Sequence, residues 1–303
     1  MDRAAFSGIH AVLYAFFGAD ERLDRAAMRR QVELCIDADV DGIVALGLAT
    51  EVAKLDEAER RTIMDWLSED VAGRVPIGIT IAGNSVAAQV AQIRHAEKIG
   101  AQWVILQPPA VGAFAAPTYI EFFGRVSAET ALAVAIQNAP AYLGRGLSAE
   151  DIARLVARYP NIRAVKGEGS AIDTAHLVRQ AGDAVPVLNG RGGLELVDNL
   201  HAGCAGFILA PDCIDVAIAA YGAYRAGDEA RAGELYAHML PSATMVMQSL
   251  ETLICYGKRL FAARAGLSVD DRQPNLVPTP FGLQLVANHA HRLGTFKSAR
   301  QIR

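Results

Sequence analysis

The sequence lacks several features that mark large classes of proteins. Its four cysteines are scattered and form no C-x-x-C pair, which argues against a zinc site or a disulfide framework and is typical of reduced thiols in a cytoplasmic protein. No apolar run approaches the roughly 20 residues that span a bilayer, and the N-terminus has no long apolar segment of a signal peptide. The formal net charge of −4 argues against a nucleic-acid partner, because phosphate binding needs a basic face. We therefore expect a cytoplasmic protein without membrane or nucleic-acid partners.

Motifs that hold metals or nucleotides are also missing. H-E-x-x-H, Walker-type and G-x-S-x-G patterns do not occur. His289 and His291 stand two positions apart, a spacing that does not place both on one face of a helix. The stretch NGRGG at 189–193 could cradle a phosphate, but it lacks the spacing of a dinucleotide fingerprint, and a strand-to-helix turn explains its glycines better. The sequence predicts no metal and no cofactor.

What the chain does have is a series of short apolar runs at regular intervals, separated by helical segments. Most runs are continuous rather than alternating, as expected for strands buried on both faces of a parallel sheet. Eight even repeats favour an α/β fold of the (β/α)₈ TIM-barrel type over an open, doubly wound sheet. The eight runs cover residues 9–17, 41–47, 75–83, 102–109, 132–140, 162–167, 185–190 and 205–211.

Helix starts and a change of pattern complete the outline of the fold. Asp56 with Glu59 fits a capping box, and Ser85 fits an N-cap. After about residue 214 the pattern is helical only, and no low-complexity linker separates this part from the rest. We predict a barrel over residues 1–225 and a C-terminal helical region over 226–303, packed on or beside the barrel.

Lysine is scarce, with five lysines among 29 basic residues. Lys166 alone ends an apolar strand-like run, IRAVKG, and a barrel places strand ends in the active site. Burial disfavours the ammonium and favours a neutral amine, which can attack a carbonyl and form a Schiff base. The structural alternative is an ion pair with a carboxylate such as Glu168. The other four lysines lie in loops or helical segments: Lys54, Lys98, Lys258 and Lys297.

The order of these motifs resembles the dihydrodipicolinate synthase / N-acetylneuraminate lyase family, which comprises class I lyases that form a Schiff base with pyruvate-type 2-oxo acids. The resemblance covers nearly the whole chain, from GIHAVLYAFF at 8–17 to the terminal helices. It places Lys166 at the family's Schiff-base lysine on the sixth strand. It also implies a homo-oligomer, either a dimer or a tetramer, and a small-molecule 2-oxo acid as substrate.

Departures from the family pattern argue against dihydrodipicolinate synthase itself. The usual Gly-Thr-Thr-Gly-Glu after strand two reads Gly47-Leu48-Ala49-Thr50-Glu51 here, so both threonine hydroxyls are missing. The family's two relay tyrosines, which shuttle protons, are also replaced, and Tyr142 stands near the position of its frequent arginine. The two positions that correspond to the tyrosines are Gln137 and, approximately, Ala110.

Two segments are similar to the branch of the family that dehydrates 2-keto-3-deoxy sugar acids. They are QNAP at 137–140 and the Lys-x-Glu sequence formed by Lys166 and Glu168. This resemblance implies that Lys166 condenses with the C2 ketone. Glu168, or a water that it orients, would remove a proton from C3, and the enamine would expel the C4 hydroxyl. A salt bridge that holds the loop remains the alternative role of Glu168.

Residues at the strand ends are the expected substrate contacts. The amides around Ala49 and Thr50, with the Thr50 hydroxyl, would hold the substrate carboxylate. Gln137 and Asn189 are candidates for sugar hydroxyls. Gly190 and Leu209 complete the predicted site, since each lies at the end of a predicted strand.

Two other functions remain open. A pyruvate-type aldolase that cleaves or forms a 2-oxo-4-hydroxy acid needs the same lysine, so the sequence cannot separate it from a dehydratase. The loss of the relay residues also allows a barrel that binds a 2-oxo acid or sugar acid without turnover. The presence of Lys166 in an otherwise apolar strand argues against a barrel that only binds.

Overall fold

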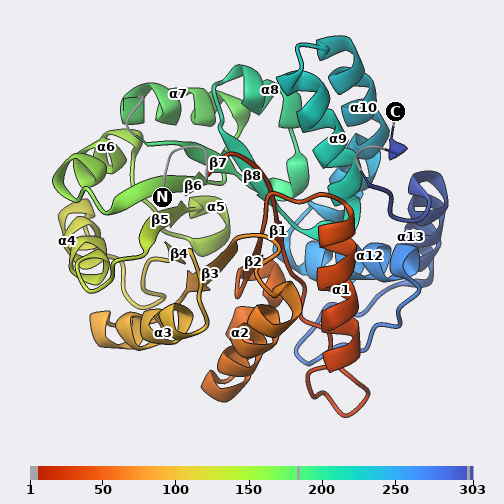
Figure 1. The fold of residues 1–303 in the computed structure, drawn as a ribbon, viewed down its shortest axis with the longest axis horizontal. Coiled ribbons are helices and arrows are strands. Elements are labelled where there is room, and N and C mark those ends of the chain that lie inside the picture. Colours follow the sequence, from red (N-terminus) through yellow and green to blue (C-terminus); the bar gives the residue numbers. More distant parts are fainter. Residues whose placement is uncertain (1–5, 183–184, 299–300, 303) are drawn as a thin grey trace.

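Eight parallel strands close into a barrel in the computed structural model, which describes residues 6–182, 185–298 and 301–302. Each strand pairs with its neighbours in sequence, and β1 closes the barrel against β8, where Ile9 lies opposite Phe207. The strands occupy the centre of the molecule and the helices surround them (Figure 1). The TIM-barrel prediction is confirmed. The strands are β1 (Gly8–Val12), β2 (Gly42–Ala45), β3 (Ile77–Ile81), β4 (Trp103–Leu106), β5 (Ala133–Asn138), β6 (Ile162–Gly167), β7 (Val187–Asn189) and β8 (Gly206–Leu209).

Most strands are shorter than their apolar runs, and β1 shows why. The run was expected to extend to residue 17, but the strand ends at Val12. The Tyr14 N–H donates to the side chain of Gln31 on α1 at 2.8 Å instead of continuing the ladder. Apolar character thus continues past the strand because Tyr14 and Phe16 are buried beneath the C-terminal helices, where both rings lie near Phe261.

The amino-terminal end of the barrel is filled by two large side chains that point inward. The rings of His10 on β1 and Trp103 on β4 lie 5.5 Å apart, edge to face. A Cβ at Gly42 would lie 2.5 Å from the His10 ring, and one at Gly78 would lie 2.6 Å from the Trp103 ring, so only glycine fits at both positions. Burial lowers the pKa of His10 to about 4, which keeps it neutral. This end is packed core.

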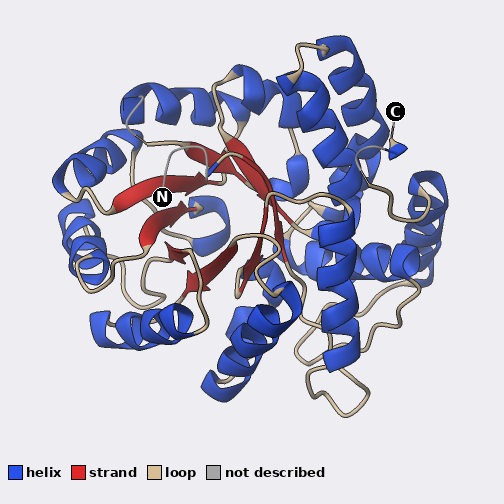
Figure 2. Cartoon of the chain, in the orientation of Figure 1, coloured by secondary structure: helices blue, strands red, loops and turns tan. Residues whose placement is uncertain are grey.

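Helices cover the outside of the strands (Figure 2). The predicted starts of α2 and α3 are confirmed: Asp56 and Glu59 form a reciprocal capping box, and the Ser85 hydroxyl accepts from the Ala88 N–H. The short α5 follows β5 directly and precedes the covering helix α6. These helices are α1 (Arg25–Asp37), α2 (Glu57–Val71), α3 (Val86–Lys98), α4 (Ala116–Ser127), α5 (Pro140–Leu143), α6 (Ala149–Arg158), α7 (Ala171–Ala181), α8 (Leu196–His201) and α9 (Ile214–Arg225).

The C-terminal helices pack on the barrel beside α9 and α1. A buried two-point ion pair joins the two parts: Arg264 on α12 contacts Asp215 on α9 at 2.6 and 3.0 Å. The boundary at residue 225 stays a prediction. None of the helices in the described ranges is both long and apolar enough to cross a membrane. The C-terminal elements are α10 (Glu229–Val246), α11 (Leu250–Thr252), a π-helical turn (Leu253–Gly257), α12 (Lys258–Ala265) and α13 (Pro280–Leu293).

Candidate active site

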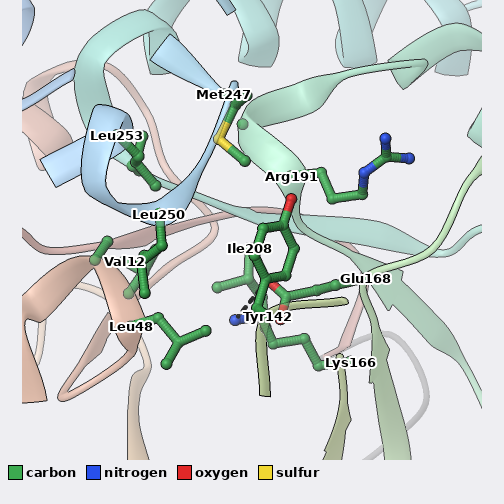
Figure 3. A pocket seen from close by; sticks show the side chains of 13 residues that line it. Val12, Leu48, Tyr142, Lys166, Glu168, Arg191, Ile208, Met247, Leu250 and Leu253 are labelled. Carbon is green, nitrogen blue, oxygen red and sulfur yellow. Dashed lines mark ion pairs between the residues drawn. The ribbon is translucent and has the colours of Figure 1, made fainter. Parts of the chain in front are cut away.

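Lys166 lies near the end of β6, and its side chain reaches a cavity at the carboxyl end of the barrel (Figure 3). The cavity measures about 40 Å³ and adjoins a more open hollow of about 660 Å³ that shares several of its walls. Only 3% of Lys166 is exposed. The residues that line the inner cavity are Val12, Leu48, Ala49, Tyr142, Lys166, Glu168, Arg191, Gly192, Ile208, Ala210, Met247, Leu250 and Leu253.

Glu168 is the acidic partner of this lysine. Its Oε1 lies 3.3 Å from Lys166 Nζ, and both side chains are almost fully buried. Parallel β6 places the two residues on the same side of the strand end, because side chains two positions apart share a face. Glu168 thus forms the ion pair that was considered for it and also faces the cavity beside the amine, while its catalytic role stays a prediction.

Gln137 holds Glu168 from the other side. Its Nε2 donates to Glu168 Oε2 at 2.6 Å, and its Oε1 accepts from Gln107 Nε2 at 2.9 Å. All three side chains are buried. Gln137 was expected to bind a sugar hydroxyl, but its amide is already engaged at both ends and fixes the carboxylate. Gln107, directly after β4, holds Gln137 in this chain of hydrogen bonds.

Asn189 and Gly190 likewise shape the site rather than supply free polar groups. Asn189 Nδ2 donates to Asn199 Oδ1 at 2.6 Å and lies 3.1 Å from Thr174 Oγ1, while Asn189 Oδ1 accepts from the Gly190 N–H at 2.7 Å. Its expected contact with a sugar hydroxyl is therefore not favoured by the geometry. A Cβ at Gly190 would lie 2.5 Å from Glu168 Oε1. Glycine is required there because the carboxylate approaches so closely.

Thr50 faces away from the cavity. It is fully buried, and its hydroxyl donates to the Leu13 carbonyl at 2.6 Å, while its N–H bonds to the Gly47 carbonyl. The hydroxyl that was expected to hold a substrate carboxylate instead fastens the loop to the end of β1. Leu48 and Ala49, which precede it in a 3₁₀ turn (Leu48–Thr50), do line the cavity.

Leu209 was placed one residue out of register. Side chains alternate along a strand, and Ile208 on β8 and Ala210, directly after β8, line the cavity. Leu209 lies on the opposite side, 3.6 Å from the position a Cβ on Gly193 would take. A continuous apolar run gives no sign of which face points inward, so the sequence could not settle this register.

Tyr142 is a polar group of the cavity that was not among the predicted site residues. It comes from α5, and its ring lies beside Glu168 with the hydroxyl pointing toward Arg191 (Figure 3). Burial raises the pKa of Tyr142, the Glu168 charge raises it further, and Arg191 opposes both. The phenol is therefore neutral at pH 7 and able to donate a hydrogen bond.

The wall opposite these groups is hydrocarbon and was also missed. Leu48 and Val12 come from the barrel, whereas Met247, Leu250 and Leu253 come from the C-terminal helices (Figure 3). Leu253 begins the π-helical turn, a widened geometry that is frequent at functional sites. Nothing in the local sequence marks these apolar residues, because contact with strands more than 200 positions earlier depends on tertiary packing.

A second buried lysine lies outside the cavity. Lys258 on α12 is 0% exposed and forms an ion pair with Glu51, which also contacts Lys54 at 2.7 Å. Its ammonium stands 5.3 Å from the centre of the Phe17 ring. Burial lowers the pKa of Lys258, and the Glu51 carboxylate opposes that shift. Lys258 was expected in a helical segment, but its burial was not predicted.

Comparison with known proteins agrees with this geometry. A model of the dihydrodipicolinate synthetase family matches residues 5–277. An L-2-keto-3-deoxyarabonate dehydratase from Azospirillum brasilense is 34% identical over 205 residues, which are 66% of either chain. A 4-hydroxy-tetrahydrodipicolinate synthase from Xanthomonas axonopodis is also 34% identical, over 67% of each chain.

Solved structures give the same fold. A putative dihydrodipicolinate synthetase from Pseudomonas aeruginosa superposes with a TM-score of 0.89 and 26% identity, over 95% of this chain and 99% of the other. The Escherichia coli K12 prophage protein YagE, solved in complex with pyruvate, also gives a TM-score of 0.89, at 23% identity, over 95% of this chain and 98% of its own. At that identity the likeness to YagE speaks for the fold alone.

Proposed function

The chain belongs to the dihydrodipicolinate synthetase family and is a Schiff-base-forming lyase, and from this premise we propose that it dehydrates a 4-hydroxy-2-oxo acid of the 2-keto-3-deoxy sugar-acid type. The observation that carries the proposal is the placement of Glu168. Its Oε1 lies 3.3 Å from Lys166 Nζ at the cavity, and Gln137 fixes its other oxygen. The activity named for the Azospirillum relative supports the same reaction.

The first step joins the substrate to Lys166. The neutral amine attacks the C2 ketone, and the carbinolamine loses water to give a protonated imine. Glu168 accepts the ammonium proton of the resting pair, which frees the amine, and supplies a proton to the departing carbinolamine hydroxyl. The amides of the Leu48–Ala49 turn, at the cavity wall, are the proposed site for the substrate carboxylate.

The second step eliminates the C4 hydroxyl. Glu168 removes a proton from C3, and the electron pair moves through the new C2–C3 double bond to the imine nitrogen. The enamine then returns this pair toward C4, and the C4–O bond breaks. Glu168, now a carboxylic acid, protonates the leaving hydroxyl to give water. Hydrolysis of the unsaturated imine regenerates Lys166 and releases an unsaturated 2-oxo acid, which a C5 hydroxyl allows to tautomerise to a 2,5-dioxo acid.

Borohydride trapping tests the proposal. The protein is incubated with pyruvate or with 2-keto-3-deoxypentonate, treated with borohydride, digested and mapped by mass spectrometry. We expect a reduced adduct on Lys166 with both compounds, and loss of water from the pentonate in the untrapped reaction. Failure of every 2-oxo acid to label Lys166 would refute the proposal and favour a barrel that binds without turnover.

Product analysis separates dehydration from aldol cleavage. A probable 2-dehydro-3-deoxy-D-pentonate aldolase from E. coli is 29% identical over 161 residues, about half of each chain, so cleavage is the second candidate. Formation of pyruvate and an aldehyde would show that the protein is an aldolase rather than a dehydratase. The Lys166 imine would remain part of the mechanism. The expected dimer or tetramer and the cytoplasmic location stay predictions.

A further inference from the structure

The cavity has two chemically different faces. Lys166, Glu168 and Tyr142 form one face, and hydrocarbon side chains form the other (Figure 3). The barrel contributes Leu48, Val12 and Ile208 to the hydrocarbon face, and the C-terminal helices contribute Met247, Leu250 and Leu253. The C4 substituent of a substrate bound through Lys166 must pass between these faces to reach the mouth.

Few polar groups on this path are free to receive a hydroxyl. Glu168 is engaged with Lys166 and Gln137. Arg191 points away from the hydrocarbon side chains (Figure 3), and its Nη1 donates to the Gly169 carbonyl at 3.0 Å and to Glu195 at 2.7 Å. Among the lining side chains that the structure describes, the Tyr142 hydroxyl and the other guanidinium N–H groups of Arg191 are the donors left, and neither belongs to the hydrocarbon face.

The charged side chains that line the outer hollow disfavour a second carboxylate on the substrate. The hollow is lined by the carboxylates of Glu168, Asp173 and Glu251, with Arg191 as the basic residue of its lining. Arg191 is already paired with Glu195 at 2.7 Å. A substrate with a second carboxylate at its far end would therefore meet like charge at the mouth, which is unfavourable.

We propose that this site selects 4-hydroxy-2-oxo acids whose substituent beyond C4 is an uncharged hydrocarbon group, such as methyl or phenyl. This inference rests on the proposed function: it keeps the 4-hydroxy-2-oxo acid unit on which Lys166 acts and replaces the hydroxylated chain of a sugar acid with a hydrocarbon group. A hydroxyl placed against the leucines loses its water without gaining a partner, whereas a methyl group gains apolar contact. One such difference in an apolar pocket changes kcat/KM by roughly 10- to 100-fold.

A matched pair of probes tests the selection directly. 4-Hydroxy-2-oxopentanoate carries a methyl group where 2-keto-3-deoxypentonate carries a hydroxymethyl group. 4-Hydroxy-2-oxo-4-phenylbutanoate and 4-hydroxy-2-oxoglutarate extend the series toward an aryl group and a second carboxylate. The consumption of each probe is measured, because that readout does not depend on which bond the enamine breaks.

We expect kcat/KM to be about 10-fold or more higher for the methyl compound than for the hydroxymethyl compound, and lowest for the dicarboxylate. Equal or higher kcat/KM for the hydroxymethyl compound or the dicarboxylate would overturn the inference. If pyruvate labels Lys166 but the order of probes is reversed, only this inference fails. If no 2-oxo acid labels Lys166, the proposed function fails first.

The variant Leu48→Thr tests whether the hydrocarbon face causes this substrate preference. A hydroxyl there supplies a partner for the substrate, so the preference for methyl over hydroxymethyl should fall by about 10-fold. Leu283→Thr is the matched control, since Leu283 lies on α13 and is 44% exposed. An unchanged preference in a folded Leu48→Thr protein that still forms the pyruvate adduct would contradict the inference.

Discussion

Two lysines of this protein are buried against carboxylates, yet only one stands at a cavity. Lys166 ends a barrel strand, lies 3.3 Å from Glu168 and lines the inner cavity. Lys258 is more deeply buried, pairs with Glu51 and packs near Phe17. Burial of an ammonium is therefore not a sign of chemistry by itself. What distinguishes Lys166 is space beside the amine for a carbonyl compound.

The partners of the two lysines differ in the same way. Glu51 is shared between Lys258 and Lys54, so its charge is neutralised within the protein. It follows the turn that lines the cavity, and Lys258 follows the π-helical turn that begins with Leu253. We interpret this ion pair as a fastening that holds the C-terminal helices against the barrel, so that the apolar face can form.

The largest expected effect is the loss of Schiff-base chemistry on replacing Lys166. Lys166→Arg keeps the charge but cannot form an imine, because guanidinium does not deprotonate in proteins. We expect no borohydride-dependent adduct with pyruvate and a fall in kcat of at least about 10³-fold. Lys258→Arg, provided that it folds, should still label at Lys166. An adduct at Lys258 in the Lys166→Arg protein would contradict this difference between the two lysines.

Replacing Lys258 should instead affect stability. Lys258→Met leaves Glu51 buried with Lys54 as its remaining partner, and breaking such a pair costs about 3 kcal/mol or more in the free energy of unfolding. Urea denaturation measures this loss. Lys98→Met, at an exposed position on α3, is the control and should change stability by less than about 0.5 kcal/mol. Equal losses of unfolding free energy in both variants would show that the Lys258–Glu51 ion pair does not hold the C-terminal helices against the barrel.

The fully buried carboxyl of Asp212 predicts a pH dependence of stability. Tyr14 donates to Asp212 at 2.8 Å, and burial raises the pKa of Asp212 from 3.8 to about 6. The folded protein thus binds an extra proton between these values, so the stability from this group is present below about pH 3.8 and is lost as the pH rises through 6.

Asp212→Asn removes that titration. Relative to this variant, the wild type should lose about 2 kcal/mol of unfolding free energy between pH 4.5 and pH 7. Urea titrations of both proteins at the two pH values give the difference, and shifts common to both cancel. A constant difference across this range would show that Asp212 keeps an ordinary pKa in the folded protein.

The smallest expected effect concerns the position of Glu168. Gln137→Leu removes the 2.6 Å bond to Glu168 Oε2 and should slow exchange of the pyruvate C3 hydrogens for deuterium by about 10-fold, while adduct formation at Lys166 persists. Gln284→Leu, on the exposed side of α13, is the control. A parallel loss of adduct and exchange would indicate general damage to the site.

Local features of the sequence were sufficient for the elements and for the position of Lys166 at the end of a barrel strand. Asp56, Glu59 and Ser85 mark helix starts through bonds that close within four residues. The predictions were wrong for polar residues that have several possible hydrogen-bond partners. The Thr50 hydroxyl, expected at the substrate, bonds to Leu13, and Gln137 bonds to Glu168 and Gln107. Such choices among partners depend on which strands become neighbours.

The sequence by itself determined the eightfold strand–helix alternation and the carboxyl-end position of Lys166, because strand periodicity and strand ends are local properties. Only the tertiary structure decided which side chains face that lysine. Barrel closure set the register that turns Ile208 inward, and packing of the C-terminal helices brought Leu250 and Leu253 across from Glu168. Those contacts join segments far apart in the chain, and they give the pocket its two faces.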